Sequence, residues 1–110
     1  MKIFRYMWTA SSLDLKRKKL LEELKQGSVS GTVYLVVLPE SSSHVLDILK
    51  VDKINKTWLD VTDSWVIGAA SDKEEAEDLA GGIVSRAVKA TGQADVRAYL
   101  APVLTKEAEA

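Results

Sequence analysis

Residues 64–100, SWVIGAASDKEEAEDLAGGIVSRAVKATGQADVRAYL, decide the fold of this chain. The segment begins with a short apolar run, SWVIGAA, which is typical of a buried strand. Ser71 and Glu74 then have the spacing of a capping box, so a helix is predicted to begin there. That helix carries an apolar stripe on one side and ends at Gly92, a residue type that commonly follows the last turn of a helix.

The end of the same segment, residues 95–100, predicts another strand, which makes 64–100 a β-α-β unit. Outward from it, the β-branched segment 32–38 (TVYLVVL) is apolar on both faces, and Pro39 follows it. With a helix expected between neighbours, strands 32–38, 65–70 and 95–100 should form one sheet, the first two parallel. The predicted fold class is α/β, a single small domain with a short, mostly parallel sheet flanked by helices.

The rest of the chain is assigned more coarsely. Residues 2–8 are too few for periodicity to decide between a strand and the lead-in to a helix. A helix is predicted over 11–26, begun by Ser11 and Asp14, followed by a flexible joint at 27–31 and a short helix over 40–50. Residues 51–63 are assigned to a loop, with a brief strand near Trp58 as the alternative, and residues 102–110 to a polar, flexible tail.

Composition indicates one globular domain, residues 1–110, with a core over about 11–101. Apolar residues make up 46% of the chain and charged residues 28%, the balance of a folded protein. The net charge of -1 argues against broad attraction to nucleic acid or to anionic lipid. The sequence holds no cysteine, which excludes disulfides and thiolate metal sites. Without a signal-like or membrane-spanning segment, we expect a cytoplasmic protein with no membrane partner.

A basic run, KRKK at 16–19, is a candidate for nucleic-acid binding. On a helix, however, its four side chains point in four directions and cannot form one basic stripe. Glu22 and Glu23 follow within one turn and partly neutralise the run. We expect Arg17 to pack its stem against leucines and keep its guanidinium in water, with an anion or a partner carboxylate as the alternative contact. We therefore expect no nucleic-acid partner.

His44 is the chain's only histidine, so a paired-histidine metal site and a two-imidazole relay are excluded. It follows a strand predicted to be central, where open α/β sheets place their ligands. Ser42, Ser43 and Asp47 are close to it in the sequence and supply hydroxyls and a carboxylate. These residues are interpreted either as a ligand-binding or catalytic cluster or as a serine cap beside a surface histidine, and we favour the cap.

Phosphate binding has little support. The free N–H groups that follow the serine run could hold an anion, but the chain has no glycine-rich cradle of the GxxxxGK[ST] or GxGxxG type. VIGAASD, residues 66–72, is superficially similar to a strand-to-helix phosphate turn. Asp72, Glu74 and Glu75 would repel a phosphate there, and helix capping accounts for them better. We expect no nucleotide, no metal and no other cofactor.

Two adjacent glycines, Gly81 and Gly82, interrupt the predicted helix, and each costs about 1 kcal/mol relative to alanine. Counting around the helix places both away from the apolar stripe, beside Asp78, Ser85 and Lys89. Packing against the domain's own sheet therefore does not account for them. Either the cost is tolerated, or another backbone approaches that face of the helix.

Four segments carry motifs that occur together elsewhere: VYLVVLP (33–39), HVLDIL (44–49), WVIGAASDKEEAEDL (65–79) and TGQADVRAYL (91–100). In this combination the chain resembles a family of small Firmicutes proteins with YxxxLP, LLDI, VVGxAxxxxEA and TGxxDVRxYL patterns. The resemblance spans roughly residues 30–100 and implies a bacterial cytoplasmic protein of the same fold class. The family has no assigned activity, so the resemblance transfers no catalytic residues.

These observations favour a non-enzymatic binding or protein-interaction module, because no nucleophile with its base, no metal cluster and no phosphate loop can be assembled from the sequence. The expected partner is another protein or further copies of this chain. The candidate contact residues are Gly81, Gly82 and Trp58, an aromatic in a predicted polar loop. The alternative is a small enzyme or small-molecule-binding protein that uses Ser42, Ser43, His44 and Asp47.

Overall fold

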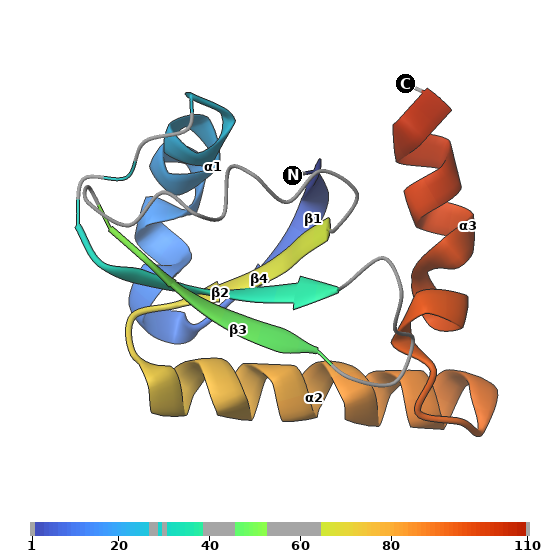
Figure 1. Ribbon diagram of the computed structural model, residues 1–110. Helices are drawn as coiled ribbons and strands as arrows, with labels where there is room; N and C mark the ends of the chain where they lie inside the picture. The colour runs from blue at the N-terminus through green and yellow to red at the C-terminus, as the bar shows by residue number, and fades with distance from the viewer. Residues whose placement is uncertain (1, 27–28, 30, 39–45, 53–64, 110) are drawn as a thin grey trace.

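The structure is a computed structural model that describes residues 2–26, 29, 31–38, 46–52 and 65–109. Its centre is a four-stranded sheet in the spatial order β1 (Lys2–Thr9), β4 (Trp65–Ala70), β2 (Val33–Leu38) and β3 (Asp47–Val51). The 3-10 helix η1 (Ser11–Lys16) and helix α1 (Arg17–Gln26) lie on one side of the sheet, and helix α2 (Lys73–Thr91) lies on the other (Figure 1). Helix α3 (Val96–Glu109) stands across one end of α2.

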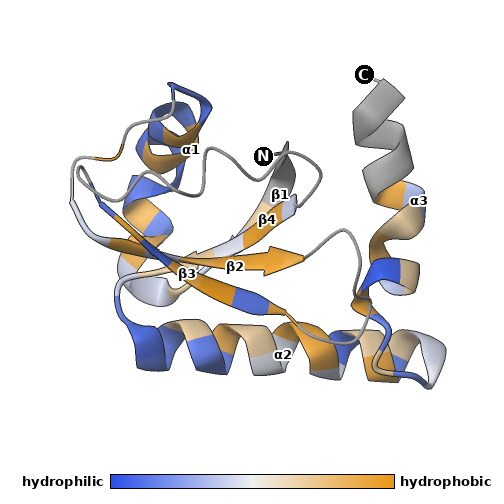
Figure 2. Cartoon of the chain, in the orientation of Figure 1, coloured by the Kyte–Doolittle hydropathy of each residue, from blue (hydrophilic) through white to orange (hydrophobic). Residues whose placement is uncertain are grey.

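Both faces of the sheet are buried, which accounts for the apolar character of its central strands. Figure 2 shows β2 and much of β4 in the hydrophobic colours between the two layers of helices. One core cluster joins the sheet to α2 and α3 and includes Val36, Ile67, Ile83 and Leu100. The other joins the sheet to α1 and includes Leu20, Leu24, Leu35, Val66 and Val37. The α/β fold class predicted from the sequence is therefore confirmed, with helices on both faces.

The direction of the strands differs from the prediction. Segments 33–38 and 65–70 do lie in one sheet, as expected, but β2 and β4 run antiparallel, with Tyr34 opposite Ala70 and Leu38 opposite Trp65. β3 is also antiparallel to β2, and only β1 and β4 form a parallel pair among the described strands. The expectation of a mostly parallel sheet is therefore wrong. The expectation rested on the helix predicted between the two segments, because neighbouring parallel strands need a crossover of that kind. The structure has strand β3 in part of that region instead.

Strand β3 takes the place of part of the helix predicted over 40–50. Ile48 packs against the core cluster on the α2 side, and Leu49 packs against the cluster on the α1 side. Adjacent residues that bury on opposite faces have the period of a strand, so the sheet satisfies both side chains where a helix could bury only one face. The first residues of the predicted helix, 40–45, and most of the predicted loop, 53–63, lie outside the described residues.

The last predicted strand, 95–100, is instead the start of helix α3. The Asp95 carboxylate accepts a hydrogen bond from the Ala98 backbone N–H at 2.9 Å, which is the arrangement of a helix N-cap. Val96 and Leu100, four residues apart, are both buried in the cluster shared with α2. A spacing of four suits one face of a helix, so cap and burial together override the alternation that predicted a strand. The helix continues to Glu109, through residues expected to form a tail.

Helix α2 confirms the predicted helix and its glycine stop, with a start one residue later than expected. Asp72, rather than Ser71, is the N-cap, and its carboxylate accepts a hydrogen bond from the Glu75 N–H at 2.8 Å. Gly92 ends the helix in the left-handed conformation, with φ of 80°, and its N–H donates to the Val88 carbonyl. Glycine is the residue that adopts this conformation without a steric penalty.

The N-terminal region contains both elements that the sequence suggested in outline. Residues 2–9 form β1, and the predicted helix over 11–26 divides into η1 and α1. The predicted cap is wrong, since Ala10 precedes η1 and makes no side-chain cap, while the Asp14 carboxylate accepts a hydrogen bond from the Thr9 hydroxyl. The half-buried Arg17 donates from Nε to the Met7 carbonyl at 3.2 Å, which ties the start of α1 to β1.

Gly68 lets helix α2 lie close to β4. A Cβ atom at Gly68 would be 3.0 Å from Leu79 Cδ2 and 3.2 Å from Val36 Cβ, closer than side chains normally approach. The glycine in the middle of this strand is therefore required by the packing of the helix on the sheet. The contact fixes which side of α2 faces the core, and by exclusion which side faces solvent.

Candidate functional site

The most distinctive surface of the described structure is the solvent-facing side of α2. The core side of this helix is formed by Ala76, Ile83 and Ala87, all at most 1% exposed. At about 100° per residue, the bond between Gly81 and Gly82 lies on the opposite side of the helix. The α2 outer strip, as we call this surface, consists of six exposed residues: Glu74, Asp78, Gly81, Gly82, Ser85 and Lys89.

The glycine pair has no packing role within the described domain. A Cβ atom at Gly81 or at Gly82 would meet no heavy atom within 4 Å, whereas one at Gly68 would be obstructed. Neither glycine has a positive φ, since Gly92 is the one glycine of this kind among the described residues. Neither close packing inside the domain nor backbone conformation therefore requires glycine at these two positions.

Apart from Lys73 at its first position, the exposed charges on α2 are separated along its length. Glu74, Glu77 and Asp78 lie in the N-terminal half, and Arg86 and Lys89 lie in the C-terminal half, all exposed. This order favours the helix, because acidic groups near the N-terminus and basic groups near the C-terminus complement its dipole. Figure 2 shows the charged N-terminal end of α2 as blue bands. The same order gives the outer side of the helix one acidic and one basic end.

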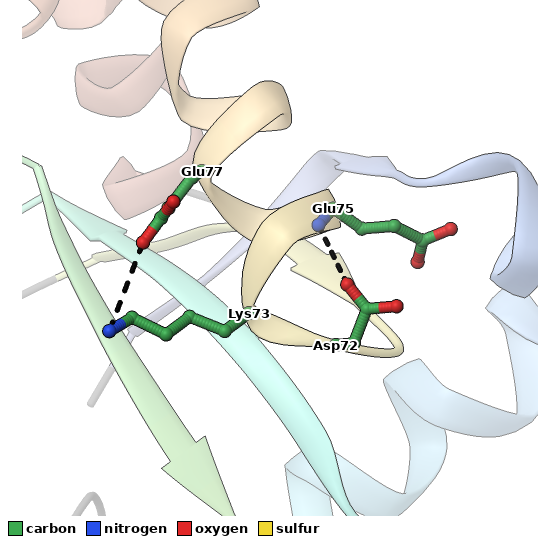
Figure 3. A network of polar contacts seen from close by, with 4 residues as sticks. All are labelled: Asp72, Lys73, Glu75 and Glu77. Carbon is green, nitrogen blue, oxygen red and sulfur yellow. Dashed lines mark hydrogen bonds and ion pairs between the residues drawn. The ribbon is translucent and has the colours of Figure 1, made fainter.

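A second polar cluster forms where β1 and β4 end side by side. The helices that follow β1 and β4 turn to opposite faces of the sheet. In open α/β sheets, ligands bind at the place where the helices diverge in this way. Here the Ser12 hydroxyl lies 2.6 Å from the Ser71 hydroxyl and donates to Glu75 Oε1 at 2.7 Å. The Ser71 backbone N–H also donates to Glu75 Oε1, at 3.0 Å. Figure 3 shows Glu75 beside its cap Asp72 at this end of the helix.

The Glu75 carboxylate accepts two hydrogen bonds at this junction. The Ser71 N–H and the Ser12 hydroxyl both donate to it, so these two donors of the junction are already used within the chain. The sequence indicates a capping role for Asp72 and Glu75 but gives no role to Ser12. No sequence signal places Ser12 near Ser71, because only the pairing of β1 with β4 brings the two turns together.

The residues of the proposed ligand cluster are placed only in part. Ser42, Ser43 and His44 lie outside the described residues, as does Trp58. Asp47 is described, and it is exposed at the start of β3, opposite Val37 of β2. Asp47 is the one member of the cluster within the described ranges, so the cluster itself stays a prediction.

A shallow hollow of about 160 Å³ lies between η1, α1 and the start of β2. Its lining includes Leu13, Leu20, Lys16 and Lys19, and the Lys19 ammonium lies 4.0 Å from Glu23 Oε1. Pockets that enclose a small-molecule ligand are generally about 300 Å³ or larger. This hollow is too small and open to rank above the α2 outer strip as a functional site.

In the described part of the chain, no three His, Cys, Asp or Glu side chains gather closely enough to hold a metal ion. None of the helices within the described ranges has the length and hydropathy needed to cross a membrane. No protein-family model, curated protein or solved structure matches this chain.

Proposed function

We propose that this chain is a non-enzymatic protein-interaction module whose contact surface is the α2 outer strip. The observation that carries the proposal is the glycine pair Gly81–Gly82, which is exposed at the centre of a well-formed helix. Two alanines there would stabilise the helix by up to about 1 kcal/mol each. A partner that packs closely against the helix backbone supplies a reason for glycine that the domain itself does not.

The outer strip also has the shape and chemistry of a docking surface. It runs along a helix of 19 residues that is held rigidly by its buried side, so a partner need not order it on binding. Its centre lacks side chains, and its two ends carry opposite charges. Charges at the rim of an interface favour one orientation of the partner over others.

We also propose that the chain belongs to the family of small Firmicutes proteins whose four motifs it shares, and that it acts in the bacterial cytoplasm. The support is the combination of motifs in one chain of this length. A solved structure of a family member should show the strand order β1-β4-β2-β3 and the parallel pairing of its first and last strands. A different strand order in that member would remove the proposal.

The interaction function is tested by site-specific photocrosslinking in living cells. A photoreactive amino acid replaces Ser85, on the outer strip, and in a matched control it replaces Glu22, an exposed residue of α1 on the other side of the sheet. We expect a discrete crosslinked product from position 85 and none from position 22. The same product from both positions, or from neither, would show that the outer strip is not the contact surface.

A further inference from the structure

The outer strip of α2 has an internal symmetry about the Gly81–Gly82 bond. Glu74 and Lys89 are equidistant from this bond along the chain and carry opposite charges. Asp78 and Ser85 are also equidistant from it, and they pair a carboxylate with a hydroxyl. All four lie on the solvent side of the helix, opposite the buried residues Ala76, Ile83 and Ala87.

We infer that the partner of this surface is a second copy of the same chain, bound by antiparallel pairing of the two α2 helices. This inference rests on the proposed function, since it names the partner of the same surface. The two-fold axis of the pair passes between the two Gly81–Gly82 bonds, which face each other at the centre. Such an interface uses the same patch on both copies, as in most symmetric dimers.

Charge complementarity selects this arrangement over the alternatives. Antiparallel pairing places Glu74 of each copy opposite Lys89 of the other, so one favourable contact occurs twice. Parallel pairing in register would instead place Glu74 against Glu74 and Lys89 against Lys89. Like charges that face each other disfavour the parallel arrangement. Of the two arrangements in register, the strip is therefore complementary to itself only in the antiparallel one.

The glycine pair allows the two helices to approach closely at their crossing point. Interaxial distances of packed helices are about 8–10 Å and depend on the side chains at the contact. With no Cβ at Gly81 or Gly82, the backbones can reach the short end of this range. At that distance, Asp78 of one copy contacts Ser85 of the other. A single helix pair buries a small area, so the dimer is reversible, with a Kd on the order of micromolar or weaker.

The inference is tested by charge reversal at the two ends of the strip. Sedimentation equilibrium over a concentration series compares the wild type with Glu74→Lys, with Lys89→Glu and with the combined variant. Each single reversal creates two repulsive contacts because of the symmetry, and we expect it to weaken dimerisation roughly tenfold or more. The combined variant restores opposite charges and should dimerise nearly as well as the wild type.

The matched control is Glu22→Lys, which changes the net charge equally on an exposed position of α1. It should leave the dimer unchanged. Raising the salt concentration should weaken the wild-type dimer and relieve the repulsion in the single variants, because exposed charges are screened.

Thermal melts separate this effect from a loss of fold stability. Glu74→Lys and Lys89→Glu each oppose the helix dipole, so the combined variant should be the least stable of the series. An instability artefact would therefore make the combined variant the weakest dimer, whereas the inference makes it a strong one. If a reversed variant does not fold, Glu74→Gln and Lys89→Gln replace it and should weaken dimerisation less, in the same direction.

The results distinguish failure of the inference from failure of the proposed function. A wild type that stays monomeric at high concentration overturns self-association. A crosslink from position 85 to a different protein would then leave the interaction function standing. A dimer that is insensitive to both single reversals would show that copies associate through another surface, which also overturns the inference.

Discussion

The two sides of helix α2 contrast in how far the fold accounts for their residues. On the core side, Ile83 and Ala87 are buried against the sheet, and Gly68 of β4 is required for the helix to lie so close. On the outer side, Gly81 and Gly82 are exposed and meet nothing that would require glycine. Packing within the described domain therefore accounts for the residues on one side of this helix and does not account for the glycines on the other side.

The contrast indicates that the outer side of α2 is the place to look for a function of this chain. Residues that lower stability and have no role in packing indicate a requirement from outside the domain. The glycine pair is such a case, because every residue type except proline is more favourable than glycine inside a helix.

The largest effect is expected on the core side. Ile83→Ala removes a buried side chain that is 1% exposed and leaves a cavity between α2 and the sheet. We expect the free energy of unfolding to fall by about 3 kcal/mol, measured by chemical denaturation.

The matched control for this change is Val88→Ala on the same helix. Val88 is 43% exposed, so its truncation should change the free energy of unfolding by less than about 0.5 kcal/mol. Equal losses for the two variants would mean that α2 is not packed on the sheet in the way described.

A smaller effect of opposite sign is expected on the outer side. Replacement of both Gly81 and Gly82 by alanine should raise the free energy of unfolding by up to about 1 kcal/mol per site, because alanine favours the helix and neither methyl group meets an obstacle. The same variant should associate less, because the methyl groups hold the two helices apart. Thermal melts and sedimentation of the same samples measure both effects.

Gly31→Ala provides a control for added methyl groups, since Gly31 is exposed outside any helix and its Cβ would also meet nothing within 4 Å. It should leave association unchanged. A glycine-pair variant that gains stability and associates like the wild type would leave the glycines as tolerated defects and remove the main support for an interaction surface.

Much of this arrangement could be predicted from local sequence signals. The apolar stripe and glycine stop of α2 gave the helix, and two continuous apolar runs gave strands β2 and β4. The exposed position of Gly81 and Gly82 followed from helix periodicity alone. Such features depend on neighbours within one or two turns, which a sequence displays directly.

The topology could not be predicted because it depends on contacts between distant segments. Whether β2 and β4 run parallel was decided by β1, which the sequence left undecided, and by β3, which was assigned to a helix. The helix at Asp95 was missed because a short alternating run hides a cap that only the buried pair Val96 and Leu100 reveals. The contact between Ser12 and Glu75 was missed for the same reason, since it joins residues 63 positions apart.

The smallest effect concerns an ion pair on the flank of α2, beside the outer strip, where the Lys73 ammonium lies 3.9 Å from Glu77 Oε1 (Figure 3). Both side chains are more than half exposed, so solvent screens the pair, and lysine on the N-terminal side is the less favourable order. A double-mutant cycle with Lys73→Ala and Glu77→Ala should give a coupling energy of about 0.5 kcal/mol or less. The pair on α1, Lys19 and Glu23 at 4.0 Å, has the same spacing and order, but the Glu23 side chain is only 20% exposed. Solvent screens it less, so its coupling energy should be the larger of the two. A small coupling on α2 would show that this exposed pair contributes little to folding, as expected of surface charges screened by solvent. A coupling energy above about 1 kcal/mol would give an exposed charged pair of α2 a structural role, so that folding would no longer depend on the buried side of the helix alone.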